Sequence, residues 1–158
     1  MRFVYEIVDA AEKRRGNMNS KIYTDGCPEE ARKIREKVFI EEQGFLSEFD
    51  DLDAEAAHVV IYADKELPVA TCRVFWNEEK DSYVIGRLAV CREWRGKKLG
   101  AAAVQEAERY ILQNHGHRVT LHAQCQARPF YEKLGFVSYG EIDEDEGCAH
   151  IWMKKELS

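Results

Sequence analysis

A short basic turn between an apolar segment and a helical pattern is the part of the sequence best suited to chemistry. Residues 83–90 are mainly apolar, residues 95–100 read RGKKLG, and a helical spacing of apolar residues begins at Leu99. Backbone N–H groups at the start of a helix lack partners, and the helix dipole is positive there. Such a turn binds anions, most often phosphate. Three basic side chains add positive charge: Arg95, Lys97 and Lys98.

The two most familiar phosphate-binding patterns are absent from the sequence. It contains neither G-x-x-x-x-G-K-[ST] nor G-x-G-x-x-G. The first pattern is typical of P-loop nucleotide-binding proteins and the second of Rossmann dinucleotide-binding proteins. We therefore expect neither a kinase of the P-loop type nor a Rossmann oxidoreductase.

The basic turn and a second segment resemble one superfamily of transferases. RGKKLG resembles the acetyl-CoA signature [QR]-x-x-G-x-[GA] of the GNAT N-acetyltransferases, with Lys98 in the place of the first signature glycine. ARPFYEKLGF at 127–136 resembles the last helix of the same superfamily. Three further segments resemble its ElaA/YjcF-type branch: REKVFIEEQ at 35–43, EFDDLD at 48–53 with His58 beyond, and AHIWMK at 149–154. The resemblance extends over residues 19–155.

The resemblance implies a fold and an activity. The implied fold is α/β, a single-domain GNAT-like fold with a mixed, mostly antiparallel central sheet and flanking helices. The implied activity is acetyl-CoA-dependent N-acetyltransfer to a primary amine of a small molecule, with acetyl-CoA as co-substrate and no metal. The alternative is a non-catalytic acyl-CoA-binding or sensing module, because a fold does not fix a function.

The resemblance also implies which residues contact the cofactor. The pantetheine would pair with the strand backbone at 88–90, and the pyrophosphate would rest on backbone N–H groups of 95–101, where glycine allows close approach. Gln124 occupies the place of an asparagine that is frequent in the family. The implied cofactor-binding residues are Leu88, Ala89, Val90, Arg95, Gly96, Lys97, Lys98, Leu99, Gly100, Ala101, Gln124, Ala127, Phe130 and Tyr131.

Two residues are predicted to be catalytic. Amide formation from a thioester needs a neutral amine and a leaving thiolate. Tyr131 matches the tyrosine that the family places near the CoA sulfur, and a phenol can donate a proton to the thiolate. Glu42, at the end of an expected helix, is the favoured general base. Other candidates for the base are Glu48, Asp50, Asp51, Asp53, His58 and His150. Water-relayed deprotonation without a dedicated base is an equal alternative.

The order of predicted elements agrees with one mixed α/β domain. Apolar residues with a spacing of three and four predict a helix over 28–42, a long helix from Leu99 to near Gly116, and a short helix over 127–134. An acidic loop is expected over 45–57. Alternating or continuous apolar residues predict strands over 20–23, 58–63, 69–76, 83–90, 118–123, 136–139 and 149–153.

The first seventeen residues stand outside the resemblance. We expect residues 18–158 to form the N-acetyltransferase domain and residues 1–17 to be an extension. Apolar residues at helical spacing over 3–12 predict an amphipathic helix that packs on the domain or on a partner. The alternative is an artefact of an upstream start, with Met18 as the true first residue, because KRRG at 13–16 can be encoded by a purine-rich ribosome-binding sequence.

Composition excludes several classes of protein. The chain has 158 residues, 45% hydrophobic and 33% charged residues, and a net charge of −6. The negative charge argues against a nucleic-acid binder, and neither a membrane-spanning apolar run nor a secretory signal is present. The five cysteines contain no C-x-x-C pair and are odd in number, so we expect neither a zinc site nor a disulfide scaffold. A cytoplasmic protein is expected, with a small-molecule amine as partner and a homodimer left open.

Two acidic clusters suggest a preference for cationic acceptors. They precede the second and the last predicted strands: Glu48, Asp50, Asp51 and Asp53, then Glu141, Asp143, Glu144, Asp145 and Glu146. In the resembled fold both connections can approach the acceptor side of the sheet. If they converge, they form a negative rim that attracts cationic amines. The alternative is two separate solvated loops.

Overall fold

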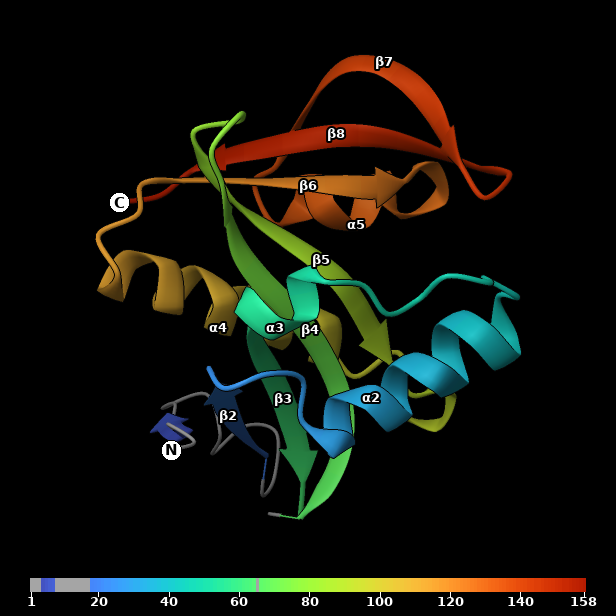
Figure 1. The fold of residues 1–158 in the computed structure, drawn as a ribbon, viewed down its shortest axis with the longest axis vertical. Helices are drawn as coiled ribbons and strands as arrows, with labels where there is room; N and C mark the ends of the chain where they lie inside the picture. The colour runs from blue at the N-terminus through green and yellow to red at the C-terminus, as the bar shows by residue number, and fades with distance from the viewer. Residues whose placement is uncertain (1–3, 8–17, 65) are drawn as a thin grey trace.

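The computed structural model describes residues 4–7, 18–64 and 66–158 (Figure 1). These residues form one eight-stranded sheet in the order β1-β2-β3-β4-β5-β6-β8-β7, with helices packed on it. The strands are β1 Val4–Ile7, β2 Asn19–Tyr23, β3 Ala57–Ala63, β4 Leu67–Asn77, β5 Ser82–Val90, β6 Arg118–Gln124, β7 Val137–Asp145 and β8 Cys148–Glu156. The helices are α2 Glu29–Arg35, η1 Glu36–Glu42, α3 Leu52–Glu55, η2 Arg92–Trp94, α4 Leu99–Gln113, η3 Cys125–Ala127 and α5 Arg128–Lys133.

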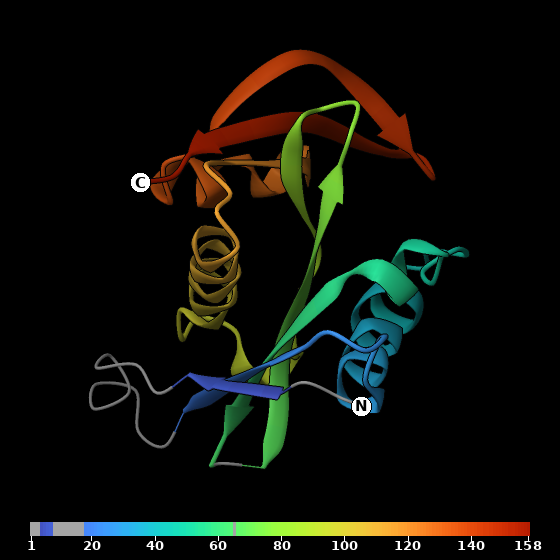
Figure 2. The same cartoon turned by 60° about the vertical axis from the view of Figure 1, so that its left-hand side comes forward.

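Helices cover both faces of the central strands. Figure 2 shows α4 on one side of β3–β5 and α2 with η1 on the other. Every residue of β3 is buried, because its alternate side chains enter two separate cores: Val59 and Ile61 pack with α4, and Val60 and Tyr62 pack with α2. This explains why the strand reads as a continuous apolar run. Within the described ranges, no helix is long and apolar enough to cross a membrane.

The sheet splits between β5 and β6, its one parallel pair of neighbours. These strands pair only at Tyr83 with Val119 and at Val84 with Thr120, and then diverge. On its other side β5 stays paired with β4 to its end, where Ala70 faces Val90. The final residues of β5 therefore have a backbone edge that no strand of the described sheet occupies. This edge positions the site described below.

The predicted mixed, mostly antiparallel sheet with flanking helices is confirmed, with two differences in detail. The helix expected over 28–42 changes its winding: α2 ends at Arg35, and η1 continues as a π-helix in which the wider turn closes with a bond from Gln43 N to Val38 O of 3.1 Å. The strand expected over 136–139 continues to Asp145. It is interrupted by a register shift between Tyr139 and Asp143, where Gly140 has φ +73°.

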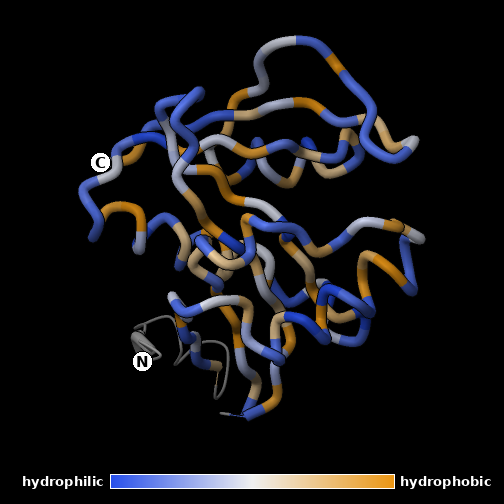
Figure 3. Tube along the Cα trace, in the orientation of Figure 1, coloured by the Kyte–Doolittle hydropathy of each residue, from blue (hydrophilic) through white to orange (hydrophobic). Residues whose placement is uncertain are grey.

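The extension of β7 changes the interpretation of the second acidic cluster. Residues 141–145 lie within a strand that pairs with β8, and only Glu146 belongs to the turn. The sequence did not indicate a strand because acidic residues disfavour strands in general. Figure 3 shows the hydrophilic stretch of β7 that leads to the β7–β8 turn. Pairing with an apolar β8 outweighs the weak propensity.

The structure describes four residues of the helix predicted over 3–12, and for these four the prediction is wrong. Val4–Ile7 form β1, which pairs antiparallel with β2, from Val4 opposite Tyr23 to Ile7 opposite Ser20. An isolated helix of this length is marginal in water, and the edge of a sheet offers backbone partners. Residues 3 and 8–12 of the predicted helix, and the interpretation of 13–17, lie outside the described residues.

Candidate active site

A cavity of about 900 Å³ lies where β5 and β6 diverge. Its lining comes from η1 and the loop after it, β5, the basic turn, the start of α4, β6, α5 and the β7–β8 turn. All but one of the predicted cofactor-binding residues line this single cavity, although they come from four separate segments. The exception is Lys97, whose ammonium lies 4.6 Å from the ring centroid of Trp94.

The basic turn has the backbone geometry of an anion-binding loop. Gly96 and Lys98 both have left-handed φ, at +79° and +62°. Lys98 therefore adopts the conformation that favours the glycine usual at its place, at a cost of about 1–2 kcal/mol. Helix α4 begins at Leu99, and Ala102 N donates to Lys98 O at 3.1 Å. The N–H groups of the three residues between, 99–101, have no partner within the helix.

Packing leaves little room for a side chain at position 100. A Cβ built there would lie 3.2 Å from Phe130 Cζ and 3.6 Å from Val90 Cγ2. Phe130 comes from α5 and Val90 from the end of β5, so the turn is held between the two elements. A larger residue at this position would push the turn away from the strand edge.

A bulge shapes the strand edge that the cavity exposes. The β4–β5 register shifts between Thr71 and Arg73, and Arg87 takes a left-handed φ of +53°. Beyond it, Leu88, Ala89 and Val90 all line the cavity. A bulge bends the strand that contains it, and here the bulge accompanies the divergence of β5 from β6.

Glu42 lies outside the cavity lining, beside the basic turn. Its carboxylate forms a bidentate ion pair with Arg95, with distances of 2.6 Å and 2.8 Å. This hydrogen-bonded pair lowers the pKa of Glu42. A carboxylate held in this way is a weak proton acceptor, so its contacts do not favour the predicted role of general base, which stays a prediction.

The Tyr131 side chain lies against the main core and lines the cavity. Its ring contacts Phe130 and Phe136 in edge-on geometry, with centroids 5.0 Å and 5.9 Å apart. Burial raises the pKa of the Tyr131 hydroxyl, with a smaller contribution from Cys72. Burial therefore favours the protonated form of this hydroxyl.

Three of the four carboxylates in the first acidic cluster, Glu48, Asp50 and Asp53, belong to an ion network, whereas Asp51 is exposed. Arg35 Nε lies 2.8 Å from Glu48 Oε1, and Arg35 Nη1 lies 2.7 Å from Asp53 Oδ1. Arg73 Nη1 lies 2.6 Å from Asp50 Oδ1. A third arginine, Arg87, also contacts Glu48 and Asp50. These three carboxylates thus face three guanidinium groups. For them both expectations, the negative rim and the solvated loop, are wrong, because the sequence does not reveal that distant arginines pair with them.

Two further base candidates are used for structure. His58 is fully buried and its Nε2 lies 2.9 Å from Asp53 O. Burial lowers the pKa of His58, and the ring does not line the cavity. Glu48 lines the cavity but is 4% exposed and paired with arginines. By contrast, His150 lines the cavity, as Asp145 and Glu146 also do.

Three sets of hydrogen bonds join the segment 42–47 to residues that line the cavity, and the sequence indicated none of them. The first is the Glu42–Arg95 pair. In the second, Gln124 Nε2 donates to Gln43 Oε1 at 2.9 Å. In the third, the backbone N–H groups of Leu46 and Ser47 donate to the Glu146 carboxylate at 3.3 Å and 3.2 Å. No local signal could have indicated contacts between residues this far apart in sequence.

Comparison with known proteins agrees with the geometry. The sequence profile described as "Acetyltransferase (GNAT) domain" matches residues 22–157. The uncharacterized protein YyaT of Bacillus subtilis (strain 168) is 35% identical over 150 residues, which cover 89% of this chain and 97% of YyaT. The uncharacterized N-acetyltransferase YjcF of the same organism is 34% identical over 127 residues, with 78% and 88% covered.

The fold has close counterparts among solved structures. The crystal structure of Escherichia coli ElaA superimposes with a TM-score of 0.72 at 22% identity, and the alignment covers 99% of this chain and 100% of ElaA. The profile match covers most of the chain, and the signature turn and the open edge of β5 line the same cavity. The chain therefore belongs to the GNAT acetyltransferase family, and it is similar to its YjcF and ElaA members.

Proposed function

We propose that the protein is an N-acetyltransferase that uses acetyl-CoA and transfers the acetyl group directly to a primary amine of a small molecule. Family membership supports acyl-CoA-dependent acyl transfer in general. N-acetyl transfer from acetyl-CoA is supported by one observation: the signature turn, the open edge of β5 and the Tyr131 side chain line the same cavity.

The residues of the cavity fit CoA in chemistry and in order. The free N–H groups at the start of α4, with Arg95 and Lys98 beside them, suit the pyrophosphate. The open backbone edge at 88–90 offers hydrogen bonds in the spacing that an extended pantetheine amide chain can use. Phe130 and Leu99 give the cavity an apolar wall. The acetyl group would then lie near Tyr131, where β5 and β6 have separated.

The reaction requires the protein to align the amine with the thioester and to transfer protons. The amine nitrogen forms a bond to the thioester carbon, the carbon–sulfur bond breaks, and the sulfur leaves as a thiolate. The Tyr131 hydroxyl donates a proton to that sulfur. The proton released by the amine passes to water or to a basic group at the acceptor end of the cavity.

The acceptor end supports a neutral or cationic amine more than an anionic one. Asp145 and Glu146 line the cavity there, whereas Glu48, Asp50 and Asp53 of the first cluster are paired with arginines. Asp143 is paired with His122, whose Nε2 lies 2.7 Å from Asp143 Oδ1. Any steering of cationic acceptors would therefore come from the β7–β8 turn alone.

Binding of acetyl-CoA to the full chain tests the proposal. Isothermal titration should detect binding with a dissociation constant below about 1 mM, the upper end of usual KM values. CoA release in a screen of primary amines should then identify an acceptor. Absence of binding would overturn the proposal. Binding without CoA release for any amine would instead identify a non-catalytic acyl-CoA-binding module.

Replacement of Glu42 by Gln separates its two candidate roles. If Glu42 is only the partner of Arg95, E42Q removes a negative charge beside the phosphate site and frees Arg95, so KM for acetyl-CoA should fall by about threefold to tenfold with kcat nearly unchanged. Steady-state kinetics at several acetyl-CoA concentrations measure this split. Glu41→Gln, an exposed neighbour, is the matched control. A fall in kcat of about a hundredfold would restore Glu42 as the general base.

A further inference from the structure

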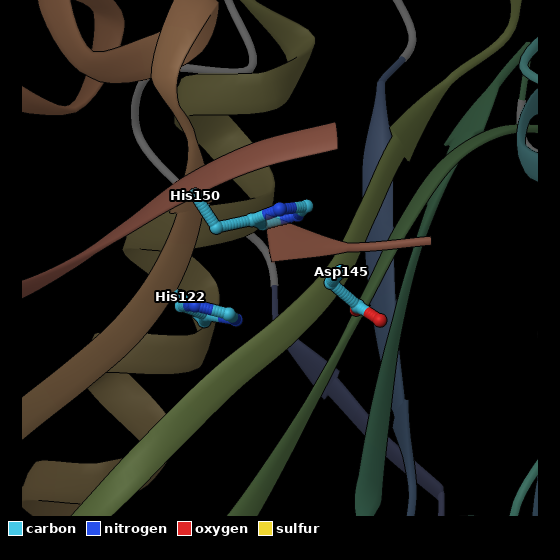
Figure 4. Close-up of side chains that lie close together, drawn as sticks. All are labelled: His122, Asp145 and His150. Carbon is cyan, nitrogen blue, oxygen red and sulfur yellow. The ribbon is translucent and has the colours of Figure 1, made fainter. Parts of the chain in front are cut away.

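Two histidines and an aspartate meet at the acceptor end of the cavity. His122 comes from β6, His150 from β8 and Asp145 from the end of β7 (Figure 4). One potential ligand atom from each residue lies within 4.8 Å of the other two. All three residues line the cavity. Because the three residues come from three different strands, no short sequence motif indicates the cluster.

Hydrogen bonds hold both imidazoles in a form that can coordinate a metal ion. His150 Nδ1 donates to Cys148 O at 2.8 Å, which leaves Nε2 with its lone pair. His122 Nε2 donates to Asp143 Oδ1 at 2.7 Å, which leaves Nδ1 with its lone pair. Metal-binding histidines usually have such an outer partner, a carboxylate or a backbone carbonyl, which fixes the tautomer and the orientation of the ring.

The two imidazole rings are stacked on each other, and the carboxylate is free to adjust. The His122 ring stacks on His150 with centroids 4.6 Å apart and on Trp152 at 4.7 Å. His150 is only 6% exposed, whereas Asp145 is exposed. In a tetrahedral site with bonds of about 2.1 Å, neighbouring ligand atoms lie about 3.4 Å apart. Metal binding therefore requires rotation of the exposed Asp145 side chain and a tilt between the two stacked rings, because the lone pair of an imidazole nitrogen lies in the plane of its ring.

We propose that His122, His150 and Asp145 form a site for a divalent transition-metal ion at the acceptor end of the cavity. Two imidazoles and one carboxylate favour ions such as Zn²⁺, Co²⁺ and Ni²⁺ over Mg²⁺ and Ca²⁺, which prefer oxygen ligands. Three protein ligands leave one coordination position of a tetrahedral ion open for a water or a ligand in the cavity. The proposal goes beyond the acyl transfer proposed above and does not depend on it.

Cobalt titration of the metal-free full chain, without an affinity tag, tests the site. We expect one Co²⁺ per chain, with the visible absorption of a tetrahedral ion and without the intense near-ultraviolet band of a cobalt–thiolate bond. That band separates this site from the five free cysteines. Each of H122A, H150A and D145N should weaken binding by about tenfold or more. The control variants His117→Ala and Glu144→Gln, both exposed residues outside the cavity lining, should bind as the unaltered chain does.

The outcomes of the cobalt titration can be distinguished from the outcomes of the acetyl-CoA test. D145N changes an exposed side chain and should fold normally, so it remains informative even if H150A does not fold. No cobalt binding in the micromolar range, or binding that all three variants leave unchanged, would overturn the metal site. Acetyl-CoA titration of the same metal-free samples tests the cofactor site by itself, because the signature turn contributes no residue to the cluster.

Discussion

Replacing Arg35 by Met is expected to lower the free energy of unfolding by about 3–5 kcal/mol, the usual cost of breaking a buried ion pair from one side. The Arg35 guanidinium is 1% exposed and holds Glu48 at 2.8 Å and Asp53 at 2.7 Å. It also donates to the backbone carbonyl of Glu48 at 3.0 Å. Without it, two carboxylates stay buried with too few partners, and the loop over 45–56 loses its attachment to α2.

Denaturant unfolding of matched variants measures this effect. Arg32→Met is the control, because the Arg32 and Arg35 guanidinium groups lie 4.5 Å and 4.7 Å from the Phe49 ring centroid, but Arg32 is only half-buried and contacts neither Glu48 nor Asp53. R32M should cost about 1 kcal/mol or less. R35K keeps the charge but loses the planar fork, so an intermediate loss is expected. Equal stability of R35M and R32M would contradict a structural role for the network.

Replacing Tyr131 by Phe is expected to lower kcat by about 10²-fold to 10⁴-fold, the range for loss of a positioned acid. Only the hydroxyl is removed, and the ring contacts with Phe130 and Phe136 remain. Acetyl-CoA affinity should therefore stay nearly unchanged. Tyr139→Phe is the matched control, since that hydroxyl contacts Lys80 outside the cavity. CoA release with the best amine of the screen measures the ratio.

The pH profile adds a second criterion for Tyr131. Burial raises the pKa of this hydroxyl, so its donor form persists above the usual tyrosine value of about 10. The unaltered enzyme should then lose no activity through Tyr131 ionisation up to about pH 10, where a tyrosine with the usual pKa would be half ionised. Y131F activity within about threefold of the unaltered enzyme across this range would remove the general-acid role.

Local features of the fold could be predicted because short-range physics controls them. The period of apolar residues defines strands such as 83–90 and the helix that begins at Leu99. The basic turn between them follows from the same stretch of chain. The prediction over 3–12 failed where a neighbouring strand competes: β1 forms because β2 supplies backbone partners, which the period of residues 3–12 does not encode.

The candidate site was predicted in part, for a related reason. The residues of the signature turn and of α5 lie in short segments, so their resemblance to a family pattern could be seen directly. Glu42 was chosen from its place at a helix end, and only its contact with Arg95, fifty-three positions away, indicates its environment. The acidic residues at 48–53 look like a solvated loop until Arg35, Arg73 and Arg87 are brought to them.

The sequence by itself determined the strand–turn–helix unit, the family and the position of Tyr131, because each depends on residues that are neighbours in the chain. The tertiary structure decided the left-handed conformation of Lys98, the burial of the ion network and the meeting of His122, Asp145 and His150. Charges and lone pairs act over a few ångströms, whichever strand carries them. Their partners are therefore set by strand order and register, and the order in which β7 and β8 join β6 appears only in the folded sheet.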